Sequence, residues 1–125
     1  MSNPWQDDID EMMEAFGQKV RDCPNFPPVT PEEWELRKKL IQEETQELID
    51  AIDARDMVKI ADGIIDVLVV TIGTGSCAGM DLSPLWDEVH YTNMKKVGGP
   101  KDPITGKQLK PEGWQPPDLA RILED

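Results

Sequence analysis

Five carboxylate residues stand at helical spacing in two neighbouring segments of the chain. The segments are LIQEETQELIDAI (40–52) and KIADGIID (59–66), and the carboxylates are Glu43, Glu44, Glu47, Asp62 and Asp66. Carboxylate oxygens are the ligands that hard divalent cations such as Mg²⁺ and Mn²⁺ prefer. Clusters of this kind are suited to the chemistry of phosphates. The pattern therefore predicts a divalent metal site between two helices.

The first of these segments places acid where an amphipathic helix should be apolar. At about 100° per residue, Leu40 and Leu48 fall roughly 40° to either side of Glu44. Glu47 also falls inside this apolar stripe, and Glu43 falls on its edge. Burying an ionised carboxylate without a partner costs on the order of several kcal/mol. These acids therefore need protons, basic partners or cations, although a solvated face remains an alternative for Glu43.

The second segment repeats the pattern, because Asp66 stands in the apolar run IIDVLVV with Asp62 one turn earlier on the same face. Few basic residues are available to pair with these acids, and Arg37 and Lys59 point roughly towards them. A di-iron centre in a helical bundle requires Glu-x-x-His motifs. The chain has a single histidine, His90, and no such motif, which excludes that kind of site.

Four helical windows are predicted to position these residues. They cover about residues 5–20, 31–55, 56–79 and 84–97, and a loop-rich tail with a short final turn at 117–123 fills residues 98–125. Thr30 is the expected N-cap of the second helix, with Pro31 at its first position and Glu33 completing a capping box. Ser83 and Pro84 give a similar signal for the fourth.

The windows and their short loops predict an all-α, antiparallel four-helix bundle that forms one domain over residues 1–125. Two helices longer than about 20 residues in so small a chain leave much apolar surface, which oligomerisation would bury.

Charge and composition narrow the class of partner. The formal net charge is −12 and the pI about 4.4, so nucleic acid polymers are not expected as partners unless the lysines of residues 95–110 form a local patch. The apolar run 63–80 is too polar for a bilayer span. Cys77 is expected to be a small buried residue. With no signal peptide at the N-terminus, we expect a soluble cytoplasmic protein.

Several motifs together resemble a known family. EETQE (43–47) followed by KIADGIID (59–66) resembles the EExxE…ExxD signature of the MazG-like all-α NTP pyrophosphohydrolases. With EVHYTNMKK (88–96) and GKQLKPEGWQPPDL (106–119), the chain is most similar to the short, phage-type, phosphoribosyl-ATP-pyrophosphohydrolase-like members. The resemblance covers about residues 10–118. One position departs from the signature, because Lys59 stands where its second motif has glutamate.

The resemblance implies a helical dimer or dimer of dimers that cleaves nucleoside triphosphates between the α and β phosphates with Mg²⁺ or Mn²⁺. We expect Glu44, Glu47, Asp62 and Asp66 to hold the cations, with Glu43 at or next to them. Glu47 or Glu43 would be the general base for an attacking water. Asp66 would supply the acid that Lys59 replaces. A phage-encoded enzyme would act in the host cytoplasm.

Residues outside the acidic segments are candidates for substrate binding. By the family pattern Lys96 would contact phosphates and Asn93 the sugar or phosphates, although a lysine at a helix C-terminus is also favoured by the helix dipole. Phe16, Trp5, Trp34 and Trp86 are candidate stacking platforms, but aromatic residues at helical spacing more often lie in a core. His90 is either a pocket group or a surface residue. Similar enzymes favour dGTP or GTP, which we adopt as the expected substrate.

Two alternatives stay open at the level of sequence. A phosphoribosyl-ATP pyrophosphohydrolase would keep the fold and change the substrate. A nucleotide-binding helical oligomer without catalysis would account for Lys59. The sequence leaves open the base, the sugar, the number of metals, and the choice between dimer and tetramer.

Overall fold

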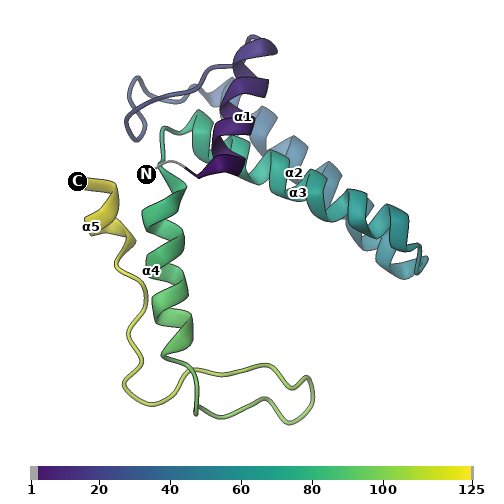
Figure 1. The fold of residues 1–125 in the computed structure, drawn as a ribbon, viewed down its shortest axis with the longest axis vertical. Coiled ribbons are helices and arrows are strands. Elements are labelled where there is room, and N and C mark those ends of the chain that lie inside the picture. The colour runs from purple at the N-terminus through teal and green to yellow at the C-terminus, as the bar shows by residue number, and fades with distance from the viewer. Residues whose placement is uncertain (1–2, 125) are drawn as a thin grey trace. The chain divides into compact units, whose positions relative to one another are not determined.

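The computed structural model describes residues 3–124, and helices are the regular structure found there (Figure 1). They are α1 (Pro4–Ala15), α2 (Pro31–Asp53), α3 (Met57–Cys77), α4 (Leu82–Met94) and α5 (Leu119–Glu124). Two isolated β-bridges are the only strand-like pairings in this range. The predicted all-α class is confirmed. None of the described helices combines the length and hydrophobicity that crossing a bilayer requires.

The chain divides into two compact units, Met1–Leu82 and Ser83–Asp125. The first holds α1, α2 and α3. The second holds nearly all of α4 together with the segment that leads to α5. The single domain expected from the sequence stays a prediction.

In the first unit α2 and α3 run side by side in opposite directions, and α1 packs against α3 (Figure 1). The buried core lies where these helices meet the loop before α2, and it consists of Ile9, Met13, Val29, Cys77 and Ala78. Cys77 is buried, as the sequence predicted.

The start of α2 and both ends of α3 are marked by capping residues or glycine. The Thr30 hydroxyl accepts from the Glu33 N–H, and the Glu33 carboxylate accepts from the Thr30 N–H, which confirms the predicted capping box. The Asp56 side chain caps the start of α3. Gly79 follows the end of α3 at φ +78°, and its N–H donates to the Ser76 carbonyl.

The helical windows predicted at about 5–20 and 84–97 extend beyond the C-terminal ends of α1 and α4. Helix α1 ends at Ala15 instead of about residue 20, because Gly17 at φ +77° turns the chain away. The Gly17 N–H donates to the Glu14 carbonyl in that turn. Helix α4 spans Leu82–Met94 instead of about 84–97, so Ser83 and Pro84 lie within its first turn.

Arg21 ties the loop between α1 and α2 to both helices that follow. Its guanidinium donates to the Glu33 carboxylate at 2.8 Å and to the carbonyl of Cys77 at 2.9 Å. The Arg21 hydrogen bonds hold the pKa of Glu33 down at about 2. This buried ion pair had no signal in the sequence pattern.

The second unit is closed by hydrogen bonds between α4 and the segment after it. The Trp114 indole N–H donates to the Thr92 carbonyl at 2.7 Å, and the Gln108 amide donates to the Lys96 and Gly99 carbonyls. The final turn predicted at 117–123 corresponds to α5.

Candidate metal centre

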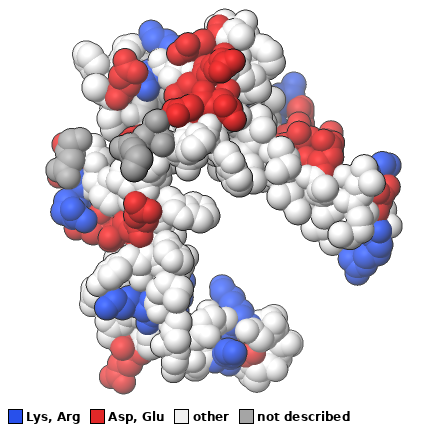
Figure 2. Space-filling model, in the orientation of Figure 1, with Lys and Arg blue, Asp and Glu red and all other residues white. Residues whose placement is uncertain are grey.

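Three of the five predicted carboxylates converge between α2 and α3. Glu44 and Glu47 are one helical turn apart on α2, and Asp66 faces them from α3. Each offers one oxygen, and these oxygens all lie within 4.8 Å of one another. We call Glu44, Glu47 and Asp66 the carboxylate cluster. Acidic side chains gather on the surface over α1 and again over the α2–α3 pair (Figure 2).

A glycine allows the two helices to approach closely at this level. A Cβ added to Gly63 of α3 would lie 3.1 Å from the Leu48 Cα and 3.2 Å from its Cβ. Such distances are tighter than ordinary van der Waals contact. Gly63 is buried and lies within one turn of Asp66 on α3. Leu48 likewise lies within one turn of Glu44 and Glu47 on α2. Glycine at this position therefore permits the close approach of α2 and α3 beside the carboxylate cluster.

The cluster is electrostatically crowded. Glu44 is half-buried, and its Oε2 atom is buried with no hydrogen-bond partner among the described residues. Desolvation by burial raises the pKa of Glu44, and the charges of Glu47 and Asp66 raise it further. Burial likewise raises the pKa of Asp66, with added repulsion from Asp62 and Glu47. The ionised cluster is thus unfavourable without a positive charge.

The other two predicted ligands lie at the margin of the cluster. Asp62 is exposed and acts on Asp66 through its charge. Glu43 is exposed and outside the group of close oxygens, as its position at the edge of the stripe indicated. Glu47 was expected inside the apolar stripe but is exposed in the described chain. The half-burial of Glu44 and Asp66 agrees with the helical wheel.

The two basic residues expected near the acids do not pair with them. Arg37 and Lys59 make no ion pair within residues 3–124, where the ion pairs are Arg21–Glu33, Lys38–Glu35 and Arg121–Asp118. Lys59 is exposed in the first turn of α3, where its N–H donates to the capping Asp56. Within the described part of the chain, no lysine or arginine therefore forms an ion pair with the cluster.

The predicted substrate-binding residues fall in both units and are largely accessible. In the first unit Phe16 caps the end of α1 and is 68% exposed. In the second unit Asn93 and His90 are exposed on α4. Lys96 lies beyond the end of α4, and its ammonium sits 5.0 Å from the centre of the Trp114 ring. Its backbone N–H donates to the Asn93 carbonyl of α4 at 3.0 Å, so Lys96 contacts both the helix end and Trp114.

The remaining aromatic candidates are not core residues of the described chain. Trp5, Trp34 and Trp86 are exposed, so the expectation that aromatic residues at this spacing lie in a core is wrong for them. Trp114 was missed as a candidate, although it stands in the quoted motif GKQLKPEGW. Lys110 also stacks on it at 5.0 Å. Lys110, which stands four residues before Trp114 in that motif, was the available signal.

One of the comparisons with known proteins agrees with this geometry. The comparison with curated proteins found no match. The family model described as phosphoribosyl-ATP pyrophosphohydrolase matches residues 9–93, a range that contains the whole carboxylate cluster. The match covers more than half of the chain. The chain therefore belongs to the phosphoribosyl-ATP pyrophosphohydrolase family of the MazG-like all-α superfamily, and it is a pyrophosphohydrolase that acts on phosphoric anhydride bonds.

Proposed function

We propose that the chain is a Mg²⁺- or Mn²⁺-dependent nucleoside triphosphate pyrophosphohydrolase, which converts a (d)NTP to the (d)NMP and pyrophosphate. The observation that carries the proposal is the carboxylate cluster, whose oxygens lie within 4.8 Å of one another. The family match supports cleavage of a phosphoric anhydride. Enzymes of the superfamily generally depend on divalent metals.

The residues fit a hard divalent cation. The donor set is made of carboxylate oxygens, which Mg²⁺ and Mn²⁺ prefer over other donors. The buried Glu44 Oε2 lacks a partner among the described residues, and a cation would satisfy it. Asp62, which acts on Asp66 through its charge, matches the aspartate of the second motif. Asp66 would supply the acid that is missing where Lys59 stands. We assign Glu44, Glu47 and Asp66 as ligands, with Asp62 and Glu43 at the margin.

The chemistry divides between the cation and the protein. When bound, the cation lowers the pKa of a water molecule and neutralises charge on the triphosphate. Glu47 or Glu43 accepts the proton of the water that attacks the α- or β-phosphorus in line. Glu47 is better placed for this role, because it belongs to the cluster and is accessible. Glu44 is better placed to hold charge, because it is half-buried.

Substrate contacts are assigned from the second unit and from Phe16. Lys96 would bind phosphate, and Asn93 the sugar or phosphate oxygens. Phe16, 68% exposed, is available to stack on a base, and His90 is available to contact one. We retain dGTP or GTP as the expected substrate. We also retain the cytoplasm as the expected location, or the host cytoplasm if a phage encodes the enzyme.

We also propose that the active form is a homodimer or homotetramer. Helix α3 is apolar on several faces, and Met57, Val58, Ile64 and Ile65 are exposed along it in the single chain. Solvent is an unfavourable environment for such a helix, and a second copy would cover it.

Hydrolysis of phosphoribosyl-ATP is the second candidate function. The family model that matches residues 9–93 carries that description, and the carboxylate cluster would serve either substrate, since both reactions release pyrophosphate.

The deciding experiment is pyrophosphate release from the common ribo- and deoxynucleoside triphosphates and from phosphoribosyl-ATP, each with Mg²⁺, with Mn²⁺ and with EDTA. We expect metal-dependent release from one or two triphosphates. Glu44→Gln should abolish it, whereas Glu35→Gln, an exposed position on the same helix, should not. Turnover of phosphoribosyl-ATP alone would establish the second candidate, and metal-independent turnover would contradict the proposed site.

A further inference from the structure

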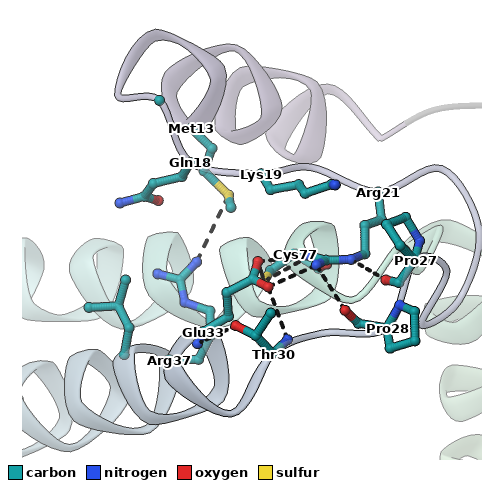
Figure 3. Close-up of a pocket in the computed structure, with 12 residues that line it drawn as sticks. Met13, Gln18, Lys19, Arg21, Pro27, Pro28, Thr30, Glu33, Arg37 and Cys77 are labelled. Carbon is teal, nitrogen blue, oxygen red and sulfur yellow. Dashed lines mark hydrogen bonds and ion pairs between the residues drawn. The ribbon is translucent and has the colours of Figure 1, made fainter.

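A pocket of about 500 Å³ lies between the end of α1, the loop before α2 and the first turns of α2 (Figure 3). Met13, Leu36, Pro27 and Pro28 give it apolar walls. Its volume falls within the range of small-molecule sites, which runs from about 300 to 1,000 Å³. None of the five candidate metal ligands lines it, so it is separate from the carboxylate cluster.

Arg37 lines this pocket as a buried cation without a counter-charge. The residue is 5% exposed, and it makes no ion pair within residues 3–124. Its buried Nε has no hydrogen-bond partner among the residues that the structure describes. The Nη1 atom of Arg37 points towards Met13 and lies 3.9 Å from the Met13 sulfur, which is a weak acceptor (Figure 3). Most of the five N–H donors are therefore left for another partner.

The fold makes room for this guanidinium instead of expelling it. A Cβ at Gly73 of α3 would lie 3.0 Å from the Arg37 Nη1. Gly73 is buried, so the guanidinium rests against bare backbone there. Because burial disfavours an unpaired charge, a residue kept in this position without a carboxylate is expected to meet an anion from outside the chain.

The other charges around the pocket leave an excess of positive charge. Arg21 and Glu33 neutralise each other through their ion pair at 2.8 Å. Lys19 also lines the pocket and has no ion-pair partner among the described residues. Arg37 and Lys19 thus contribute two uncompensated cations, in a chain whose formal net charge is −12.

We propose that this pocket binds a small organic phosphate, with Arg37 as the principal anion contact, Lys19 as a second cation of the pocket lining, and the apolar walls against the organic part. A guanidinium fork matches the oxygens of a phosphate. A phosphate monoester carries a charge of about −1.5 to −2 at neutral pH, which two cations balance better than they balance a single carboxylate. The site requires no metal and does not depend on the proposed hydrolysis.

The test is calorimetric titration of the full chain in EDTA with AMP, inorganic phosphate and adenosine as probes. AMP should bind with one site per chain, inorganic phosphate more weakly, and adenosine without measurable heat. Arg37→Met, which keeps an apolar stem, should weaken AMP binding about tenfold or more. Lys19→Ala, at an exposed position, should weaken it a few-fold. Glu44→Gln should leave it unchanged.

Amide chemical shifts provide a second readout that does not depend on the Arg37 variant folding. AMP should shift the amides of Gly17, Gln18 and Gly73, and Lys19→Ala should reduce those shifts at equal AMP. No AMP binding in EDTA, shifts confined to other parts of the chain, or undiminished binding by a folded Arg37→Met protein would each overturn the proposal. Equal affinity for AMP and inorganic phosphate would overturn the role of the apolar walls. Loss of binding in Glu44→Gln would place the ligand at the carboxylate cluster instead.

Discussion

Glu44 carries an electrostatic penalty that a cation would remove. Its Oε2 atom is buried without a partner among the described residues, and its pKa is raised by burial and by the charges of Glu47 and Asp66. If position 44 served only the fold, the folded protein would be more stable with a neutral side chain there. The arrangement is therefore informative, because stability and metal binding make opposite demands on the same carboxylate.

Glu44→Gln is expected to have effects of opposite sign in the absence and presence of metal. Without metal it removes like-charge repulsion, so the free energy of unfolding should rise by up to about 1 kcal/mol. With excess Mg²⁺ the wild-type protein should gain stability that grows with the logarithm of the ratio of free Mg²⁺ to the dissociation constant, about 2.7 kcal/mol at a ratio of 100, and the variant should gain much less. Urea unfolding in EDTA and in Mg²⁺ measures both. A variant less stable than wild type in EDTA would contradict this account of Glu44.

The pH dependence of the metal-free protein follows from the same shifts. The pKa values of Glu44 and Asp66 are raised above ordinary values of 4.5 and 3.8. At a pH just above these ordinary pKa values, the folded state then binds more protons than the unfolded state. The contribution of the two groups to stability should therefore fall as pH rises through this window.

The contribution of Glu33 to stability depends on pH in the opposite direction, because the pKa of Glu33 is lowered from 4.5 to about 2. Its stabilising contribution is present above pH 4.5 and is lost as the pH falls towards 2. The difference in unfolding free energy between wild type and a Glu44→Gln, Asp66→Asn double variant cancels the Glu33 contribution. In EDTA that difference should favour the double variant increasingly as pH rises from the ordinary carboxyl range to neutrality. A difference independent of pH would show that the two carboxyls are not perturbed.

Much of the candidate site could be predicted at the level of residues, and the failures have physical causes. Helical geometry placed Glu44 and Asp66 on facing sides of neighbouring helices, because spacing along one helix is fixed by its period. Exposure of Glu47 and of the tryptophans was not predictable in this way, since it depends on which faces other elements cover. The burial of Arg37 beside Gly73 depends on contacts between α2 and α3, which the spacing of residues within one helix does not predict.

At the scale of elements, helix ends were predictable where a residue type forces them. Thr30 and Asp56 supply caps for α2 and α3, and Gly79 supplies a left-handed turn. The end of α2 at Asp53 was set about two residues late, because the left-handed position after it is occupied by Arg55 at φ +55° instead of glycine. The end of α1 was missed although Gly17 marked it, because apolar periodicity continues to Val20.

Gly63→Ala should separate α2 from α3 at the level of the carboxylate cluster. Helix propensity alone would favour alanine by about 1 kcal/mol. The new Cβ would instead meet the Leu48 backbone at 3.1 Å, and overpacking of this kind costs about 1–3 kcal/mol. We expect a net loss of stability, weaker Mg²⁺ binding and slower hydrolysis. Thr71→Ala, at an exposed position of α3, is the matched control and should leave all three nearly unchanged.

The result separates packing from propensity. If Gly63→Ala were more stable than wild type and bound Mg²⁺ equally well, the close approach of Gly63 to Leu48 would not determine the spacing of the carboxylates. If stability fell while Mg²⁺ affinity stayed the same, the glycine would serve packing only.

At the scale of the whole molecule, α3 has more apolar surface than one chain covers. Helices α1 and α2 pack against it, yet Ile64 and Ile65 remain 46% and 55% exposed. Trp5, Ile9, Leu68 and Ile65 are among the residues that line an apolar groove of about 310 Å³ between α1 and α3. A helix that is apolar on most sides is stable only when it is surrounded, which favours a second copy of the chain as the missing layer.

Ile65→Glu should therefore disrupt association while leaving the isolated chain folded. The side chain is more than half exposed in the single chain, so glutamate there remains solvated in a monomer, whereas in an interface it would be a buried, unpaired charge that costs several kcal/mol. Sedimentation velocity should show a dimer or tetramer for wild type and a monomer for the variant at equal concentration. Thr105→Glu adds the same charge at a polar, exposed position outside α3, and it should stay associated. If hydrolysis is lost when the Ile65→Glu protein is monomeric, and returns when that protein is concentrated enough to assemble, the assembly completes the site. A monomeric wild-type protein with full activity would instead mean that one chain carries all the groups that the reaction requires.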